Sequence, residues 1–264
     1  MSGPDAVLPQ PIAYGSGTNW SQPSTGTTEM MSNNANICGQ LGSWREDDAL
    51  AYTQNSRAFR KGISTFEAVD YYSQWAECHQ YDEDLRPGRY NGPLITATAV
   101  ADFFPRDREE KKIMDIAAGT GFVAEHLREK GFLHIDALEP STQMILRAKE
   151  KGLYENYYSD FLTEDPLPTI MEDTYDCVVI CGGMGEGHIP CSGIKELIRI
   201  TKPGGLICIV MREQYLVEVD EYKDRLEPLM DFLEMAGKWV QVARDTVQDY
   251  FINIPGVVYM YTKI

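Results

Sequence analysis

Long apolar runs are missing from the 264-residue sequence, and their absence excludes one class of protein. No stretch approaches the roughly 18 consecutive apolar residues that a membrane-spanning helix requires. The N-terminus also lacks a basic segment followed by an apolar one, so no secretory signal is expected. We expect no membrane association, and the cytoplasm is the expected compartment, with the nucleus as the alternative.

Positive charge is also scarce, with 24 Lys and Arg residues against 40 Asp and Glu residues and a formal net charge of −16. Acidic surfaces repel phosphate backbones. The densest basic segment, Arg106–Lys112, reads RDREEKK and is neutralised by its own acidic residues. The charge therefore disfavours a nucleic-acid partner. It favours a small-molecule substrate, with a protein substrate as the second choice.

Cysteine and histidine are few, at six and four residues, and no CxxC pair or Cys/His cluster has the spacing of a metal site. Cys177, Cys181 and Cys208 stand inside apolar runs, where a thiol behaves as a small hydrophobic side chain. We expect reduced, structural cysteines and no bound metal.

The composition divides the chain in two. Residues 1–60 are rich in Ser, Thr, Asn, Gln, Gly and Pro without periodic apolar positions, and predict a flexible or disordered tail. Residues 61–264 predict one domain, with a helical cap at 61–105 and an α/β core at 106–264. In the cap, Ser64 and Glu67 form a capping-box pattern that opens a helix to about His79, and a second helix is expected at Gly92–Phe103.

Strand and helix signals alternate in the core. The expected strands are Lys112–Ala117, Leu133–Leu138, Asn156–Ser159, Tyr175–Cys181, Leu206–Met211, Trp239–Thr246 and Val257–Thr262. The expected helices are Phe122–Lys130, Ser141–Lys151, Ser192–Thr201 and Val219–Ala236. The link between the last two strands is too short for a parallel crossover. The pattern predicts a doubly wound, seven-stranded Rossmann-like sheet with a terminal antiparallel hairpin.

A glycine-rich turn stands between the first expected strand and helix, in the segment Asp115–Gly121. Gly119 and Gly121 allow a sharp turn and a close approach to a ligand. The run from Gly119 to Ala124 also fits the dinucleotide pattern G-x-G-x-x-A, and Glu139 lies where an NAD site has its ribose carboxylate. The turn alone does not separate NAD from S-adenosylmethionine (SAM).

Asp115 favours SAM over NAD. A carboxylate at the end of the strand would lie beside the anionic pyrophosphate of a dinucleotide, whereas it suits a ligand with an ammonium and a sulfonium group. The mid-chain position of the turn and the antiparallel end of the sheet also favour SAM.

Four motifs resemble those of the class I SAM-dependent methyltransferases over about residues 110–212. They are Asp115–Gly121, Leu138–Ser141, Ser159–Phe161 and Thr201–Gly205. The resemblance implies that the first wraps the amino acid end of SAM, that Glu139 holds the ribose hydroxyls, and that Asp160 accepts from the adenine amino group. A carboxylate can accept from both ribose hydroxyls in charge-assisted hydrogen bonds.

A second set of segments resembles the methyltransferase-like proteins of the Williams–Beuren syndrome region. These segments are Tyr72–Ala76, Tyr81–Asp84, the run from Ala117 to Val123, and Gly187–Pro190. In related enzymes the aromatic residue of the Tyr-Asp pair closes over the cofactor, which is the role expected for Tyr81. The spacing differs from the more usual Tyr-Asp-x-Trp-Ala pattern, and the resemblance fixes no acceptor.

The expected site follows from these motifs. The expected cofactor-binding residues are Tyr81, Arg89, Asp115, Ala117, Gly119, Thr120, Gly121, Glu139, Pro140, Met144, Asp160, Phe161, Cys181 and Gly182. His188 and Glu186, after the fourth strand, are the candidate general bases, because a histidine pKa is readily tuned near neutrality. Residues 64–103 and 210–226 are expected to form a lid, with Met211, Arg212, Tyr215 and Tyr222 lining the acceptor site.

We expect a SAM-dependent methyltransferase that produces S-adenosylhomocysteine and a methylated acceptor. Holding the acceptor atom against the activated methyl group needs no fixed triad. Two alternatives stay open on sequence grounds. One is a non-catalytic SAM-binding protein, which would share every cofactor residue, and the other is an NAD-dependent oxidoreductase.

Overall fold

A computed structural model describes residues 45–264 of the chain. Most of the predicted tail at 1–60 lies outside the described residues. The boundary at residue 60 is wrong, however, because helix α2 (Glu46–Ala58) precedes it and buries Ala51 and Ala58. The polar composition of this segment concealed the helix, whose apolar contacts come from a few small residues and Tyr52.

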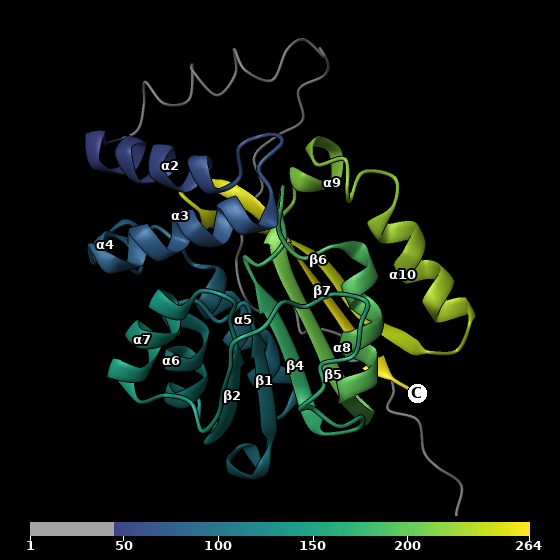
Figure 1. Ribbon diagram of the computed structural model, residues 1–264. Helices are drawn as coiled ribbons and strands as arrows, with labels where there is room; N and C mark the ends of the chain where they lie inside the picture. Colours follow the sequence, from purple (N-terminus) through teal and green to yellow (C-terminus); the bar gives the residue numbers. More distant parts are fainter. Residues whose placement is uncertain (1–44) are drawn as a thin grey trace, which may run out of the picture. The chain divides into compact units, whose positions relative to one another are not determined.

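One seven-stranded sheet forms the centre of the domain, in the order β3-β2-β1-β4-β5-β7-β6 (Figure 1). The strands are β1 (Lys112–Ile116), β2 (His134–Leu138), β3 (Tyr157–Tyr158), β4 (Tyr175–Cys181), β5 (Thr201–Arg212), β6 (Trp239–Phe251) and β7 (Ile254–Lys263). The strands β3, β2, β1, β4 and β5 are parallel, and β7 lies antiparallel between β5 and β6. The predicted doubly wound sheet with a terminal hairpin is confirmed.

The helices match the prediction less evenly. Those described are α2, α3 (Thr65–Glu77), α4 (Gln80–Asp84), α5 (Gly92–Phe103), α6 (Phe122–Glu129), α7 (Thr142–Lys151), α8 (Ile194–Ile200), α9 (Tyr215–Glu218) and α10 (Leu226–Met235). The expected helix Val219–Ala236 is wrong in its first turns, because α10 begins at Leu226. The helix α5, expected in the cap, instead packs on the sheet against β4 and β5 and beside α6.

Local sequence explains where α3 begins and where α7 begins and ends. At α3 the Ser64 side chain accepts from the N–H of Glu67, and the Glu67 carboxylate accepts from the N–H of Ser64 at 2.9 Å, which completes the predicted capping box. At α7 the Ser141 hydroxyl accepts from the N–H of Met144, and Gly152 ends the helix in the left-handed conformation.

The central strands are buried on both faces, as near-continuous apolar runs in parallel sheets require. On one face Met114, Ile116, Val178 and Ile180 pack with α8 and α10. On the other face the buried Ile113 belongs to the layer covered by α5 and α6. This packing fixes the strand ends from which the site is built.

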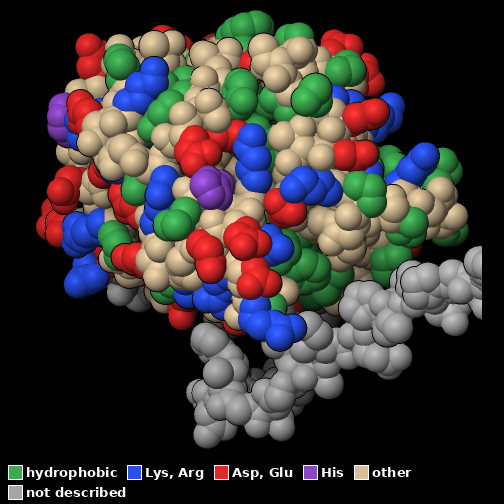
Figure 2. Space-filling view, turned by 90° about the horizontal axis from the view of Figure 1, so that it is seen from below, with side chains coloured by type: hydrophobic (Ala, Val, Ile, Leu, Met, Phe, Trp, Pro, Cys, Tyr) green, Lys and Arg blue, Asp and Glu red, His purple; other side chains and the backbone are tan. Residues whose placement is uncertain are grey.

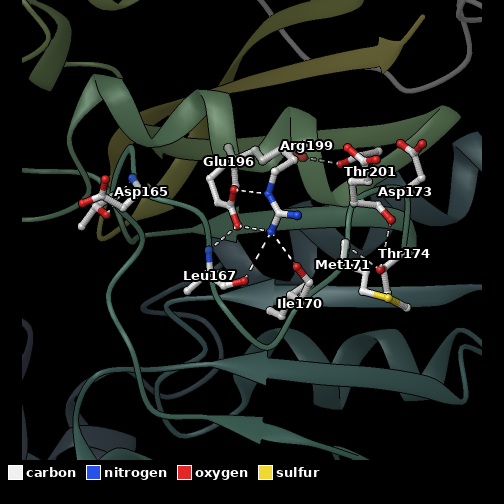
Figure 3. Close-up of polar contacts among 12 residues, drawn as sticks. Asp165, Leu167, Ile170, Met171, Asp173, Thr174, Glu196, Arg199 and Thr201 are labelled. Atoms are coloured by element: carbon white, nitrogen blue, oxygen red, sulfur yellow. Dashed lines mark hydrogen bonds and ion pairs between the residues drawn. The ribbon is translucent and has the colours of Figure 1, made fainter.

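A polar cluster fixes the connection between β3 and β4 against α8 (Figure 3). The buried Glu196 carboxylate accepts from Arg199 Nε at 2.6 Å and from the N–H of Leu167 at 2.9 Å. Arg199 also donates to the carbonyl of Ile170 at 2.7 Å. Asp160 and Phe161, at the start of the same connection, line the cavity described below.

The end of the molecule opposite α2 and α3 carries both signs of charge. Figure 2 shows Lys and Arg side chains interspersed there with Asp and Glu side chains, and the basic side chains form no continuous patch on this face. Ion pairs such as Lys202–Asp176 at 2.9 Å account for part of this mixture.

Within residues 45–264, no helix has the length and apolar character needed to cross a membrane.

The Glu196 cluster gives a stability prediction. Replacing Glu196 by Ala leaves Arg199 and the N–H of Leu167 without their acceptor, so the free energy of unfolding should fall by about 3 kcal/mol. Denaturant unfolding measures the change. The control is Lys195→Ala on the same helix, whose pair with Glu164 is exposed at 3.9 Å and should cost less than about 1 kcal/mol. Equal costs for the two variants would contradict the assignment.

Candidate functional site

A cavity of about 420 Å³ lies where β1, β2, β4 and β5 end, which is where doubly wound sheets bind ligands. Helices α2, α3 and α4 lie across this end of the sheet (Figure 1). The volume falls in the range of small-molecule sites. The predicted cofactor residues that line the cavity are Tyr81, Ala117, Gly119, Glu139, Pro140, Met144, Asp160, Phe161, Cys181 and Gly182.

The glycine turn has the backbone geometry that its sequence predicts. Gly119 and Gly121 both have positive φ, at 57° and 98°. A Cβ on Gly119 would lie 3.4 Å from the Tyr81 hydroxyl oxygen, so the turn and the α4 side chain are in close contact. Ala117 also has φ of 55°, which is strained for a residue with a Cβ and is typical of functional turns.

Glu139 is the central polar group of the cavity. Its carboxylate accepts from the N–H of Gly119 at 2.9 Å and from the N–H of Ser141 at 2.8 Å, and the residue is 7% exposed. Burial raises the pKa of Glu139 to about 7, although the two N–H donors oppose this shift. Glu139 therefore joins the glycine turn to the start of α7, and no cation among the described residues neutralises it.

Asp115 is buried in β1 and does not reach the cavity wall. The Tyr154 hydroxyl donates to Asp115 Oδ2 at 2.7 Å. Burial raises the pKa of Asp115 to about 7, the Tyr154 bond opposes the shift, and the nearby Glu139 adds to it. Thr120 and Gly121 also lie off the wall. These three residues therefore lie behind the turn that lines the cavity.

The Tyr81-Asp82 pair on α4 holds the glycine turn from outside. Thr120 Oγ1 donates to Asp82 Oδ1 at 2.6 Å, and Asp82 also forms an ion pair with Lys151 at 3.2 Å. The Tyr81 ring stacks on Phe122 with centroids 6.0 Å apart. This geometry suits the expected role of Tyr81 over the cofactor, since the ring lies directly beside Gly119.

Arg89 is not brought to the cavity, and its expected place in the cofactor site is corrected. Its Nε donates to Asp48 Oδ1 at 2.7 Å, and its terminal N–H donates to the carbonyl of Glu83 at 3.4 Å. The acidic partner belongs to α2, the helix that the sequence interpretation missed. Arg89 therefore fixes α2 to the segment before α5.

The glycine-rich segment after β4 packs too tightly for larger residues. Gly187 has φ of 71°, and a Cβ there would lie 2.4 Å from the carbonyl oxygen of Ile63. The Tyr222 hydroxyl accepts from the N–H of Gly185 at 2.9 Å and donates to the carbonyl of Ile189 at 2.6 Å. Tyr222 thus fixes this segment from behind and does not line the cavity, contrary to expectation.

The two candidate bases have different surroundings. Glu186 does not line the cavity, and its carboxylate accepts from the N–H of Gly62 at 2.9 Å, so it ties the segment after α2 to the loop. His188 does line the cavity. Of the pair, only His188 is placed to meet a ligand, and the structure gives Glu186 a positioning role.

The hydrogen bonds of His188 fix its tautomer. The Glu186 carbonyl oxygen lies 2.7 Å from Nδ1 and can only accept, so Nδ1 carries the hydrogen. Nε2 then accepts from the Tyr72 hydroxyl at 3.1 Å. Burial lowers the pKa of His188 to about 4, and the ring stacks on Phe59 with centroids 4.3 Å apart. His188 is therefore neutral at physiological pH, with a basic nitrogen toward α3.

The sequence did not predict most of the aromatic residues that line the cavity near His188. The unexpected lining residues are Asn55, Phe59, Phe66, Tyr72, Tyr90, Tyr250 and Phe251. They come from α2 and the residue after it, from α3, from the segment before α5 and from the end of β6. Their only sequence signal is a concentration of aromatics in these segments. Of the four expected acceptor-lining residues, Arg212 and Tyr215 line the cavity, whereas Met211 is buried in the core. Within residues 45–264 no three His, Cys, Asp or Glu side chains gather as a metal site.

Comparison with known sequences places this chain in a family. Residues 88–250 match the profile of a family described as a methyltransferase domain. The chain is 36% identical to human Methyltransferase-like protein 27 over 173 residues, which cover 66% of this chain and 68% of the human protein. It is 28% identical to the demethylmenaquinone methyltransferase of Renibacterium salmoninarum over 99 residues, 38% of this chain and 40% of that protein. The chain thus spans less than half of that quinone enzyme.

Solved structures share the fold. A chain of the complex between the Haloferax volcanii Trm112 methyltransferase activator and a methyltransferase superposes with a TM-score of 0.55. The sequence identity is 17%, and the match covers 74% of this chain and 96% of that one. A protein of Pyrococcus horikoshii OT3 gives a TM-score of 0.52 at 16% identity, over 69% of this chain and 94% of that one.

The buried Asp115 gives a pH prediction. Its pKa is raised from 3.8 to about 7, so the folded state holds its proton more tightly than the unfolded state, and the free energy of unfolding falls as pH rises from about 4 to 7. Asp115→Asn keeps an acceptor for Tyr154 and removes the charge. At pH 8 this variant should be more stable than the wild type by about 4 kcal/mol, with the gain vanishing below pH 4.

Denaturant unfolding at pH 4, 6 and 8 measures this difference. The control is Asp176→Asn, a partly exposed carboxylate in β4 whose pKa is lowered by the N–H of Lys112 and by Lys202. That substitution should destabilise the protein at pH 8. A loss of stability at pH 8 for both variants would contradict the burial argument for Asp115.

Proposed function

Because the chain belongs to the class I SAM-dependent methyltransferases, we propose that it methylates a small-molecule acceptor held between the glycine-rich loop and helices α2 and α3. The observation that carries the proposal is one continuous cavity that includes both Glu139 and His188. When bound, SAM supplies a methyl group activated by its sulfonium. The chain's own residues have to bind it, orient the acceptor and accept a proton where the acceptor carries one.

The residues around the glycine turn fit SAM better than a dinucleotide. Asp115 and Glu139 are buried carboxylates that form no ion pair with the described residues, and burial raises both pKa values to about 7. Asp115 precedes the glycine turn, where a carboxylate would repel a pyrophosphate and is compensated by an ammonium and a sulfonium, whereas Glu139 suits the ribose of either ligand. The antiparallel β7 also differs from the parallel strand order of dinucleotide-binding domains.

Specific roles in cofactor binding follow from these positions. We assign the ribose hydroxyls to Glu139, which keeps acceptor capacity beyond its two backbone bonds. Asp160 and Phe161 border the cavity after β3 and are assigned to the adenine. Tyr81 would cover the amino acid end beside Gly119. Pro140 and Met144 add apolar wall near the ribose.

A small acceptor suits the remaining space. Its walls carry several aromatic rings, and helices α2 to α4 are joined to the loops below by side-chain bonds, including Gly62 to Glu186 and Tyr72 to His188. The names of two relatives, the demethylmenaquinone methyltransferase and the rice 2-methyl-6-phytyl-1,4-hydroquinone methyltransferase 2, describe small ring compounds as acceptors. These similarities support a small molecule over a protein side chain as the acceptor.

The cytoplasmic location stays a prediction from the sequence.

His188 is the proposed proton acceptor for a protonated nucleophile. The Glu186 carbonyl holds the hydrogen on Nδ1, so that the Nε2 lone pair is available. The Tyr72 hydroxyl occupies this position in the structure, and it would have to move aside for an acceptor or relay the proton. A pKa of about 4 makes the nitrogen a weak base, which suits an acceptor that is acidic itself.

Calorimetry and a labelling assay test the proposal. Calorimetry should detect binding of SAM and S-adenosylhomocysteine but not of NAD. Incubation with [methyl-³H]SAM and a methanol extract of cells that express the protein should yield a labelled small molecule. Binding without transfer would support a non-catalytic SAM-binding role, and label in protein alone would contradict the small-molecule acceptor.

The Glu139 assignment predicts a loss of cofactor affinity. Glu139→Ala removes the acceptor for the ribose hydroxyls, and we expect the Kd for SAM to rise about 100-fold. Glu129→Ala, at an exposed carboxylate of α6, is the matched control and should leave the Kd unchanged. Thermal unfolding of both variants shows whether the turn is intact. An unchanged Kd in folded Glu139→Ala would refute the ribose role.

The environment of His188 predicts its titration. NMR of ¹⁵N-labelled protein should find His188 neutral, with the hydrogen on Nδ1, down to about pH 5. Tyr72→Phe removes the donor that favours the neutral ring, so the His188 pKa should rise in this variant. A wild-type midpoint near 6.5 would contradict the buried, hydrogen-bonded geometry.

A further inference from the structure

Arg212 is a buried cation with no carboxylate partner. It lies at the end of β5, is 6% exposed and lines the cavity. It is the only Lys or Arg among the described residues of the wall. No ion pair within residues 45–264 includes it. In a chain with a net charge of −16, an unneutralised buried arginine is unexpected.

Aromatic rings surround this guanidinium. Its centre lies 4.7 Å from the Phe251 ring centroid and 5.6 Å from the centroids of both Phe59 and Tyr215. The Tyr52 ring lies at 5.9 Å. Ring faces attract a cation, but they accept few hydrogen bonds and do not neutralise its charge. The rings therefore hold the guanidinium in place and leave its charge available to a ligand.

Two neighbouring polar groups complete the arrangement. The side-chain oxygen of Asn55, from α2, accepts a hydrogen bond from Arg212. The Tyr215 hydroxyl is buried at the wall and has no hydrogen-bond partner among the described residues. A guanidinium has five N–H donors in a planar fork, so Arg212 can donate to a ligand as well as to the Asn55 oxygen. A buried hydroxyl without a partner is costly, and a ligand oxygen would pair with Tyr215 as well as with the guanidinium.

We propose that Arg212 and Tyr215 bind a carboxylate of the methyl acceptor, which makes the substrate an anionic small molecule. The inference rests on the proposed function and adds the chemical class of its substrate. One arginine matches the single charge of a carboxylate, and its planar fork can donate to both oxygens. A phosphate dianion would leave a negative charge uncompensated in this wall.

The carboxylate of SAM itself is the competing occupant. Strand order separates the two ends of the cavity: Asp160 and Glu139 follow β3 and β2, whereas Arg212 ends β5 on the far side of β1 and β4. Burial is the main cause of the raised Glu139 pKa, and Arg212 is not among the groups that lower this pKa. Arg212 thus belongs to the acceptor end, and measured SAM affinity decides between the two carboxylates.

The first test separates acceptors by charge. A methanol extract of cells that express the protein is divided on a strong anion exchanger into retained and unretained small molecules. Each fraction is incubated with the full chain and [methyl-³H]SAM. Label in products of the retained fraction alone supports the proposal. Label mainly in products of the unretained fraction overturns it and leaves the methyltransferase function standing. No label in either fraction, with SAM bound in calorimetry, overturns both.

The second test uses two variants and two matched controls. Arg212→Met keeps an unbranched side chain among the rings, and should lower labelling of the retained fraction at least about tenfold with a SAM Kd within about twofold of the wild type. Tyr215→Phe should lower it about threefold or more without loss of thermal stability, because its hydroxyl has no partner to lose. The controls are Arg244→Met and Tyr261→Phe, both on the terminal hairpin.

The outcomes distinguish each alternative. A SAM Kd raised more than about tenfold in Arg212→Met assigns Arg212 to the cofactor carboxylate and overturns the proposal. Unchanged labelling in both variants overturns it as well. If Arg212→Met fails to fold, Tyr215→Phe decides, since its loss of labelling with intact stability and SAM affinity is expected from the proposal alone.

Discussion

The rest of the site depends on the burial of Glu139 at the carboxyl end of the sheet. Its two oxygens join the turn after β1 to the start of α7, so that one charged group fixes both backbone segments. Buried charge of this kind destabilises the empty protein, and burial raises the pKa to about 7. The positive φ of Ala117 is a further cost of the same turn. A cationic ligand would offset the cost of the buried charge, which links the chemistry of the cofactor to the stability of the domain.

Much of the sheet was predictable because its information is local. The buried strand β4 and the helix α5 have the predicted bounds, since apolar runs and glycine or proline ends mark them directly. The glycine turn and Glu139 were predictable for the same reason. Helix α2 and the true partner of Arg89 were not, because they depend on a long-range contact with Asp48 in a segment whose composition is polar. Both candidate bases stand in the same glycine-rich segment, and their difference comes from tertiary contacts: Glu186 bonds the N–H of Gly62, whereas His188 lines the cavity.

The acceptor end of the cavity is built from parts of the chain that lie far apart. Asn55 and Phe59 come from α2 and its end, Arg212 from β5, and Phe251 from the hairpin. No motif of the family spans these positions, so resemblance identified the cofactor and left the acceptor open. The charges at this end of the wall are more informative, since Arg212 has no acidic partner within residues 45–264. Specificity would then follow from this charge and the unpaired Tyr215 hydroxyl, which disfavour ligands that cannot pair with them.

Polar contacts join helices α2 to α4 and the turn after α2 to the segments beneath, among them the N–H of Gly62 to Glu186, the Tyr72 hydroxyl to His188, and Thr120 to Asp82. A product bound under these helices would have to break such contacts in order to leave. Where an opening of this kind is the slowest step, product release sets turnover, as in many enzymes with lids. Under that regime, weakening a single bond far from the reacting atoms would speed the enzyme up.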